Sequence, residues 1–200
     1  MPRNFQRISS TDSVRRAQEH YYGAAPGPTG AALEFDVLGD EEIAFIQARD
    51  SFYMASVSED GWPYMQHRGG RAGFLHVMGS HTLAFADYRG NRQLLSTGNL
   101  ASNDRVALFL MDYPRRERLK ILGHAKIEDA RQHGEMVTRL AGPEIQKLVE
   151  RIFFINVVAF DWNCSQHITP RFTAEQVREA VAPLQQRIAE LEAKLGETRS

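Results

Sequence analysis

Residues 84–93 of the chain read Ala84-Phe85-Ala86-Asp87-Tyr88-Arg89-Gly90-Asn91-Arg92-Gln93. The apolar residues predict the end of a β-strand, Gly90 predicts a turn, and the following residues predict a helix over 91–98. Free amides and the dipole at a helix N-terminus favour a bound phosphate. With the Arg92 guanidinium beside them, this is a candidate phosphate site. The alternative is an ordinary strand-to-helix connection with a solvated arginine.

The composition is that of a globular protein with no general attraction for polyanions. Hydrophobic residues make up 42% of the 200 residues, charged residues 24%, and the formal net charge is −1. Such a balance gives no bulk electrostatic drive toward nucleic acid or acidic membranes. No apolar run approaches a membrane span, no signal segment begins the chain, and the one cysteine fits a reducing compartment. We expect a cytoplasmic protein without nucleic-acid or membrane partners.

Short apolar segments at hairpin spacing surround the opening stretch. Strands are predicted at 52–57, 63–68, 74–78, 82–86, 105–112, 119–127 and 152–161. Gly123, inside one of them, indicates a bulge or a close neighbour. Six or seven short strands with few helices between them favour an antiparallel barrel over a doubly wound sheet. The predicted fold class is therefore mainly β, a β-barrel with α-helices.

Helices are expected outside the strands. One follows N-cap candidates at 11–13, one begins with the acidic residues at 40–42, and residues 130–150 predict helices broken at Gly142-Pro143. The arm at 1–33 is thus separate from a barrel domain at 34–171.

The C-terminal segment, 172–200, has a different pattern. Thr173 to Gln176 forms a capping box, and apolar residues then recur at alternating spacings of four and three: Val177, Val181, Leu184, Ile188, Leu191 and Leu195. Pro183 is expected to kink this helix or to begin a new one. The apolar seam requires a packing partner, either a second copy of the chain or the chain's own barrel.

Familiar catalytic motifs are absent from the sequence, including Gly-x-Gly-x-x-Gly, the P-loop, Gly-x-Ser-x-Gly and His-Glu-x-x-His. Of the seven histidines, only His167 lies at metal-ligand spacing from Cys164, and one such pair cannot complete a tetrahedral site. We predict no metal site. Cys164 is either a nucleophile beside His167 or a half-buried thiol.

Polar residues interrupt the apolar alternation in two places. Residues 64–68 read Tyr-Met-Gln-His-Arg, where a barrel strand would alternate apolar side chains. This pattern indicates either a site or an edge strand with one wet face. Trp162, in a polar segment after the last strand, is suited either to stacking on an aromatic ligand or to capping the core.

Taken in order, several segments resemble the pyridoxamine 5'-phosphate oxidase-like, FMN-binding split-barrel family over roughly residues 34–171. They are the segments at 56–64, 83–93, 103–110, 122–125 and 161–164. The resemblance implies a six-stranded antiparallel split barrel with flanking helices and a C-terminal helix. It also implies a homodimer with FMN at the interface between the two barrels.

The resemblance also assigns cofactor-binding positions. The strand after the Asp-Gly-x-Pro turn places Gln66, His67 and Arg68 at the flavin, near Asp87. The family's Ser-Arg-Lys phosphate motif falls on Asn91, Arg92 and Gln93, so glutamine replaces the lysine. The missing charge is then expected from Arg68, Arg89 or Arg118. Trp162 and Arg171 resemble the family's C-terminal Trp and Arg at the cofactor.

One departure concerns the substrate. The Arg-x-His-x-Arg segment that grips pyridoxal phosphate in the true oxidases reads His167, Thr169 and Arg171 here. This argues for a subgroup other than the true oxidases. The implied function is an FMN-dependent oxidoreductase that transfers hydride from an unidentified small molecule to flavin. His167 is the candidate acid or base. The alternatives are a non-enzymatic flavin carrier or redox sensor, or a barrel that uses F420 or haem.

Overall fold

The computed structural model describes residues 4–28, 30, 34–162 and 166–198. By its internal contacts the chain forms two compact units. The first comprises Met1–Met111 with Arg118–Cys164, and the second comprises Asp112–Glu117 with Ser165–Ser200. Each unit is described separately below.

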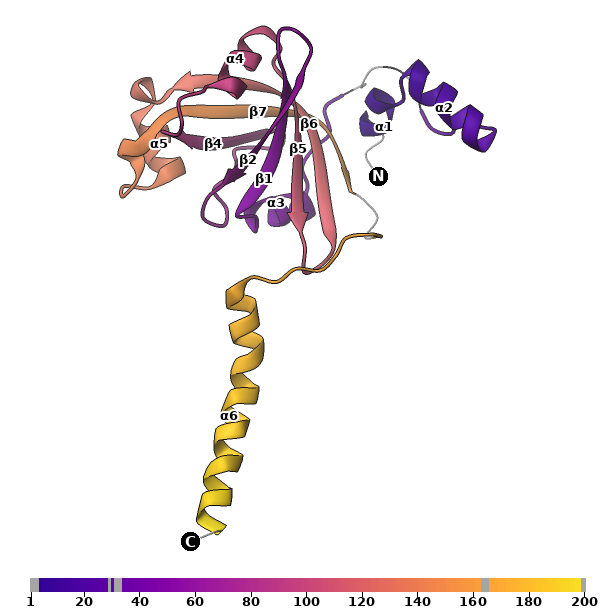
Figure 1. The fold of residues 1–200 in the computed structure, drawn as a ribbon. Coiled ribbons are helices and arrows are strands. Elements are labelled where there is room, and N and C mark those ends of the chain that lie inside the picture. The colour runs from indigo at the N-terminus through magenta and orange to yellow at the C-terminus, as the bar shows by residue number, and fades with distance from the viewer. Residues whose placement is uncertain (1–3, 29, 31–33, 163–165, 199–200) are drawn as a thin grey trace. The chain divides into compact units, whose positions relative to one another are not determined.

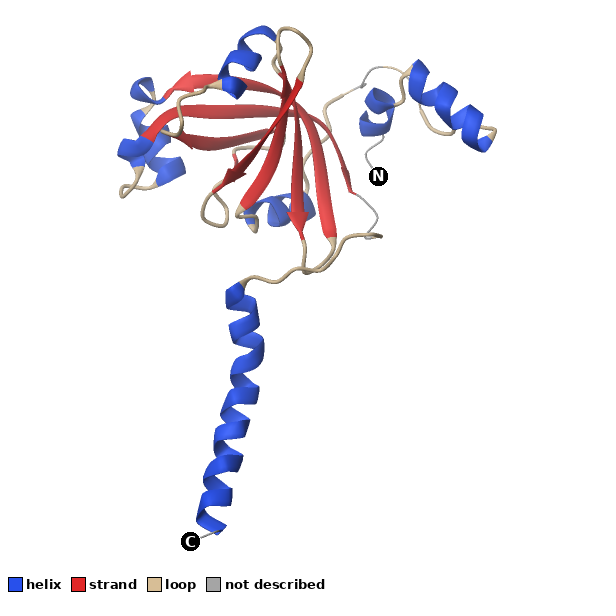
Figure 2. Ribbon diagram, in the orientation of Figure 1, coloured by secondary structure: helices blue, strands red, loops and turns tan. Residues whose placement is uncertain are grey.

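The first unit is organised around a sheet that has, within the described residues, seven strands in the order β2-β1-β5-β6-β7-β4-β3 (Figures 1 and 2). Its pairings include antiparallel β1–β2, β1–β5, β4–β7 and β6–β7. The strands are β1 (Ser51–Val57), β2 (Pro63–Gly69), β3 (His76–Val77), β4 (Thr82–Tyr88), β5 (Arg105–Asp112), β6 (Glu117–Asp129) and β7 (Val149–Trp162).

The sheet corrects the predicted mainly β, six-stranded barrel, because the fold is mixed α/β and the sheet is not closed. Among the described residues, β2 and β3 both remain edge strands. β3 has only two residues to pair, and the inner positions of β2 carry the polar side chains of Tyr64, Gln66 and Arg68. Polar groups at those positions need polar partners or solvent. They therefore do not extend the apolar core between the two edge strands, β2 and β3.

The core lies on the inner face of the sheet and follows from strand periodicity. Alternate residues of β1, β5 and β6 are buried, and Phe52 lies opposite Leu110 in the register. Three aromatic rings join the strands. Phe85 stacks on Phe153 with ring centroids 4.8 Å apart, and Phe52 meets Phe85 edge-on at 5.4 Å. Two of these rings, Phe85 and Phe153, lie against the guanidinium of Arg68.

Helices cover parts of this unit. They are α1 (Asn4–Ser9), α2 (Asp12–Tyr22), α3 (Asp40–Gln47), α4 (Leu95–Ser102) and α5 (Gly134–Ala141), with 3-10 turns at Ala130–Gln132 and Gln146–Leu148. The predicted N-cap of α2 is confirmed, since the Thr11 side chain accepts from the amide of Val14 at 3.4 Å. α3 buries Phe45 and Ile46 against the core. In the described part of the chain, no helix is long and apolar enough to span a membrane.

The second unit contains α6 (Ala174–Thr198). The predicted capping box is confirmed. The Thr173 amide donates to Gln176 Oε1 at 2.9 Å, and the Gln176 amide donates to Thr173 Oγ1 at 3.1 Å. Pro183 lies inside this helix and does not begin a new one, so that alternative is wrong.

Gly123 lies at a register shift between β6 and β7, as its place in the strand predicted. A Cβ added there would meet the Asn156 carbonyl oxygen at 2.6 Å and a methyl of Ile155 at 2.9 Å. Because backbone must shift to admit it, Gly123→Ala is expected to lower the free energy of unfolding by about 1–3 kcal/mol. Urea denaturation measures this cost. Gly79→Ala is the control, since a Cβ there meets nothing within 4 Å, and equal stability of the two variants would refute the close-approach argument.

Candidate functional site

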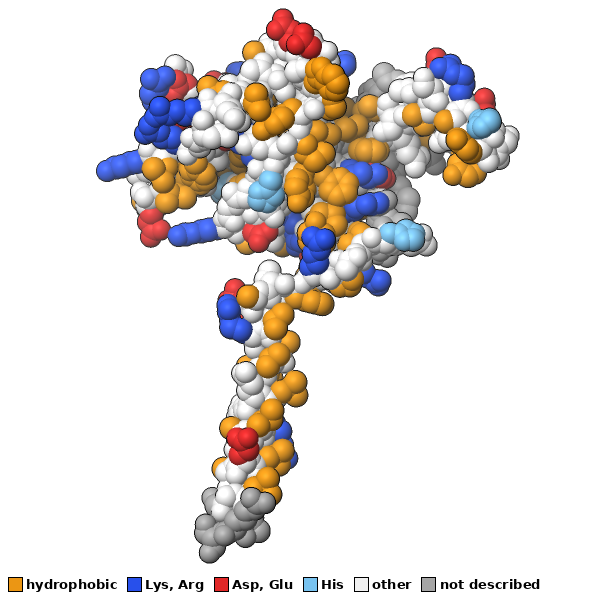
Figure 3. Space-filling model, viewed as in Figure 1, with side chains coloured by type: hydrophobic (Ala, Val, Ile, Leu, Met, Phe, Trp, Pro, Cys, Tyr) orange, Lys and Arg blue, Asp and Glu red, His pale blue; other side chains and the backbone are white. Residues whose placement is uncertain are grey.

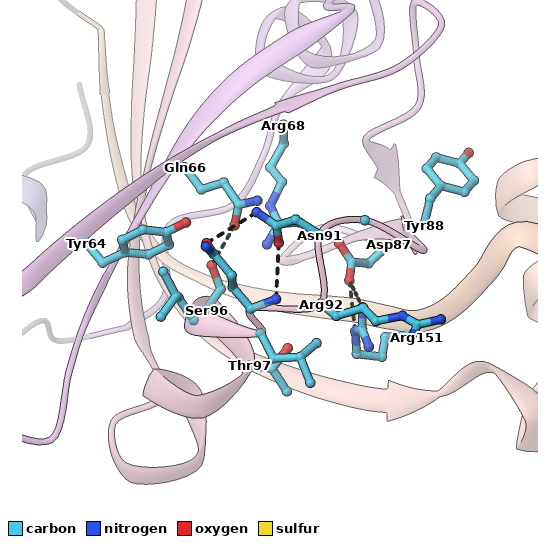
Figure 4. A pocket seen from close by; sticks show the side chains of 14 residues that line it. Tyr64, Gln66, Arg68, Asp87, Tyr88, Asn91, Arg92, Ser96, Thr97 and Arg151 are labelled. Atoms are coloured by element: carbon cyan, nitrogen blue, oxygen red, sulfur yellow. Dashed lines mark hydrogen bonds and ion pairs between the residues drawn. The ribbon is translucent and has the colours of Figure 1, made fainter.

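A pocket of about 250 Å³ lies where β2, the end of β4 and the beginning of α4 meet (Figure 4). Polar side chains dominate its lining, with a few apolar residues from the loop before α4. The lining residues are Tyr64, Gln66, Arg68, Asp87, Tyr88, Gly90, Asn91, Arg92, Gln93, Leu94, Leu95, Ser96, Thr97 and Arg151. Residues 87–93, all but Arg89, therefore form one wall of this pocket.

Strand β2 supplies the opposite wall. Because side chains alternate along a strand, Tyr64, Gln66 and Arg68 share its inner face, and Figure 4 shows them extending toward the loop with Asn91. The Ser96 hydroxyl donates to Gln66 Oε1 at 3.1 Å. This bond connects the first turn of α4 to β2 and leaves the Gln66 amide group as a donor for a ligand.

At the base of the pocket, Asp87 lies between two arginines. Arg68 pairs with one carboxylate oxygen, and Arg151 donates to the other at 2.8 Å through both Nε and Nη2. The three side chains are only 11–18% exposed. Burial lowers the pKa of Arg68, and the Asp87 carboxylate opposes that shift. The Asp87 carboxylate thus bridges both guanidinium groups, and Arg151 also pairs with Glu150 at 3.1 Å.

Arg68 is further held by aromatic rings. Its guanidinium carbon lies 5.1 Å from the ring centroid of Phe153 and 5.6 Å from that of Phe85. Its Nε is buried and has no hydrogen-bond partner among the described residues. A buried donor without a hydrogen-bond partner is energetically costly. A ligand or a water molecule that accepts from this Nε would remove that cost.

The loop before α4 differs from the predicted helix. α4 begins at Leu95, and the expected helical start at residue 91 is wrong. Arg92 and Leu94 adopt left-handed backbone, with φ of 63° and 55°, which cannot continue a right-handed helix. The Gln93 amide donates to the Asn91 side chain at 3.1 Å, so a local turn replaces the first helical turn. Strained non-glycine residues of this kind concentrate at functional sites.

The pocket carries an excess of positive charge. The lining holds three guanidinium groups and one carboxylate, and Glu150, next to the lining, pairs with Arg151 at 3.1 Å and offsets one of these charges. Arg92 is exposed and forms no ion pair with any described residue. A pocket with these charges, several polar donors and the N-terminus of α4 is suited to a phosphate monoester, which carries nearly two negative charges at neutral pH.

The structure brings six of the predicted cofactor-binding residues together in this pocket: Gln66, Arg68, Asp87, Asn91, Arg92 and Gln93. Four others lie elsewhere. His67 points to the opposite face of β2, with its ring 5.5 Å from Tyr53. Arg118 places its guanidinium over Phe109 on the outer face of the sheet.

Trp162 caps the core. Its Nε1 donates to Glu42 at 2.7 Å, and its ring meets Phe45 edge-on at 4.8 Å. Arg171 belongs to the second unit, where its guanidinium lies 5.0 Å from the ring centroid of Tyr113. His167, the candidate acid or base, is exposed in the same unit, and Cys164 lies outside the described residues. In the described part of the chain, no three His, Cys, Asp or Glu side chains are grouped as a metal site requires.

Arg151 was missing from the predicted set, although it contacts Asp87 directly. It lies one residue before the strand predicted at 152–161, and β7 begins earlier, so Arg151 is paired opposite Asp87. The sequence signal for this pair was an acidic residue, Asp87, and a basic residue, Arg151, on two different strands. Recognising it required the pairing of β4 with β7, which the sequence pattern does not determine.

Comparisons with known proteins find one family model and several solved structures that are similar to this chain. The family model described as pyridoxamine 5'-phosphate oxidase matches residues 38–160. No curated protein matches the chain. Among solved structures, a candidate pyridoxamine 5'-phosphate oxidase from Lactobacillus delbrueckii is 19% identical, with a TM-score of 0.51, covering 64% of this chain and 97% of that one.

Two further solved structures are similar at lower scores. HupZ from Group A Streptococcus is 12% identical, with a TM-score of 0.49, covering 68% of this chain and 100% of that one. General Stress Protein 26 from Bacillus anthracis is 16% identical, with a TM-score of 0.47, covering 66% and 95%. The structural likeness to the Lactobacillus protein supports a shared fold. The family model spans more than half of the sequence, and the chain therefore belongs to the pyridoxamine 5'-phosphate oxidase family.

Proposed function

We propose that this protein binds FMN, with the phosphate of the cofactor in the pocket between β2 and α4, and acts as an oxidoreductase on a small molecule. The carrying observation is the net positive charge of that pocket, with the Arg92 guanidinium open to a ligand. Membership of the pyridoxamine 5'-phosphate oxidase family supports the choice of a flavin phosphate over other phosphates.

The residues fit a phosphate group. Arg92 supplies a charged donor, and Asn91 and Thr97 supply polar side chains at the same wall. Gln93 stands where the family motif has a lysine. Its backbone amide already donates to Asn91, and it brings no charge. Arg68 and Arg151 share the Asp87 carboxylate, and Arg151 also pairs with Glu150 at 3.1 Å, so Arg92 is the pocket arginine without an ion pair among the described residues.

The pocket is too small for a whole FMN molecule, since sites for ligands of that size usually exceed about 300 Å³. The ring system of the flavin would therefore lie outside it. We propose that a second copy of the chain completes the site. Hydrophobic side chains gather over β1 and β5 in Figure 3, and the side chains exposed on that outer face of the sheet include Tyr53 of β1 and Met65 of the neighbouring β2. An apolar face of this kind suits a protein interface.

The proposed roles follow from these positions. Arg92 and Asn91 bind the phosphate, and the free amide of Gln66 is placed to donate to the polar chain that joins phosphate and ring. Bound FMN would supply the acceptor for a hydride. The roles of His67, Arg118, Trp162, Arg171 and His167 stay predictions, since none of them lines the pocket.

FMN titration tests the proposal. We expect the purified chain to quench FMN fluorescence and to show the absorbance bands of bound oxidised flavin. Arg92→Ala is expected to weaken FMN binding by about 1.5–3 kcal/mol, or roughly 10- to 150-fold, through loss of a charged hydrogen bond to the phosphate. Arg139→Ala, an exposed arginine on α5, is the matched control.

Three outcomes would count against the proposal. Absence of FMN binding would refute it, and parallel titrations with F420 and haem would show whether either takes its place. Unchanged affinity of Arg92→Ala would refute the phosphate site. FMN binding without turnover on any tested small molecule would favour a flavin carrier or redox sensor.

A further inference from the structure

The helix α6 carries an apolar seam that the other residues of its own unit leave exposed. Its members are each 37–63% exposed and follow one line along the helix in Figure 3: Val177, Val181, Leu184, Ile188, Leu191 and Leu195. They alternate at spacings of four and three, the repeat of a coiled coil. Leaving so much apolar side chain in water is unfavourable, so the seam needs a partner of matching geometry.

The residues of the seam specify the kind of partner. The repeat places Val181, Ile188 and Leu195 at a positions, and Val177, Leu184 and Leu191 at d positions. β-branched residues at a with leucine at d favour two parallel strands over three or four. Val181 and Ile188 are β-branched, and Leu184 and Leu191 follow them at d. The pattern is that of a parallel, two-stranded coil.

The flanking charges agree with a second copy in the same register. Arg187 occupies a g position and Glu192 the next e position. In a parallel pair, the g residue of each helix lies beside the following e residue of the other, so Arg187 and Glu192 meet twice across the seam. Within one helix, the Arg187 guanidinium donates to Glu190 at 2.9 Å, which leaves its other donors for this contact.

Pro183 does not oppose this arrangement. It occupies a c position, on the outer side of the helix relative to the seam, and α6 continues through it. We propose that the α6 helices of two copies of this chain pair as a parallel, in-register, two-stranded coiled coil. The proposal is independent of FMN, because it concerns only the residues of α6.

Cysteine cross-linking of the full chain tests the pairing and its direction. In a background of Cys164→Ser, which removes the only native thiol, Val177→Cys places one thiol at a d position. A parallel pair brings the two copies of residue 177 together. An antiparallel pair places residue 177 beside residue 195, about 27 Å along the axis from its counterpart.

We expect Val177→Cys to form a disulfide-linked dimer on oxidation with diamide, seen on non-reducing gels. Glu179→Cys is the matched control, because its f position faces away from the seam, and it is expected to stay monomeric on the gel. A second substitution, Ile188→Lys, should reduce the cross-linking of Val177→Cys to the level of that control. Ala193→Lys, at an f position, should leave it unchanged.

Each alternative result would overturn the proposal. Cross-links that form only when Val177→Cys and Leu195→Cys proteins are mixed would show an antiparallel pair. Absence of cross-linking from Val177→Cys would show that α6 does not pair with a second copy in this way. Cross-linking that survives Ile188→Lys would show that contact at residue 177 does not depend on the seam.

Discussion

Replacing Asp87 with asparagine is expected to lower the free energy of unfolding by about 3–5 kcal/mol, the cost of removing one partner from a buried ion pair. Asp87 is the shared partner of Arg68 and Arg151, and all three side chains are less than a fifth exposed. The variant keeps the shape of the side chain but removes the carboxylate between two guanidinium groups, so Arg68 loses its counter-charge while Arg151 keeps only its pair with Glu150. Urea denaturation followed by circular dichroism measures the change.

The matched control is Glu144→Gln. Glu144 also pairs with an arginine, Arg71 at 3.3 Å, but both side chains are largely exposed. Exposed pairs of this kind contribute about 0–1 kcal/mol. If Asp87→Asn were as stable as Glu144→Gln, the Asp87 carboxylate would not be needed to hold the arginines. Their place in the phosphate pocket would then need another explanation.

The strand pattern was the part of the fold that the sequence determined best. Alternation of apolar residues located β1, β5 and most of β6 and β7, because one face of each strand is buried in the core. The alternation of apolar residues did not determine whether the sheet closes into a barrel. Whether β2 and β3 meet depends on pairing between distant segments, and β3 pairs with β4 only through His76 and Val77.

The candidate site was predictable where it depended on residue type and failed where it depended on register or local backbone. Arginine, asparagine and aspartate in one short polar stretch indicated the wall formed by residues 87–93. The left-handed conformations of Arg92 and Leu94 had no sequence signal, since neither residue is glycine. Arg151 was missed because its relation to Asp87 exists only across paired strands.

The site and the core depend on each other through β2 and β4. The inner positions of β2 are polar, and the last of them, Arg68, lies next to the rings of Phe85 and Phe153, so β2 connects the pocket to the core. Arg68 lies at this boundary, with its guanidinium against the rings and paired with Asp87. A substitution in the aromatic layer is therefore expected to disturb the pocket as well as to lower the free energy of unfolding.

Phe85→Ala tests that dependence and is expected to destabilise the protein by about 3–5 kcal/mol, as for other buried aromatic residues replaced by alanine. Phe85 is only 1% exposed, stacks on Phe153 and meets Phe52 edge-on, so its loss opens a cavity in the middle of the sheet. Thermal and urea unfolding measure the change. Phe35→Ala, at a half-exposed position, is expected to shift stability by about 0.5 kcal/mol or less.

A second variant separates the cavity from the contact with Arg68. Phe85→Leu fills most of the volume but removes the ring face next to the guanidinium, and such swaps usually cost less than about 1.5 kcal/mol. We expect it to recover most of the stability lost in Phe85→Ala. If Phe85→Leu were as unstable as Phe85→Ala, ring contacts and not filled volume would dominate at this position. The aromatic layer would then be part of the support for Arg68, because the same ring that fills the core also holds the guanidinium at the pocket.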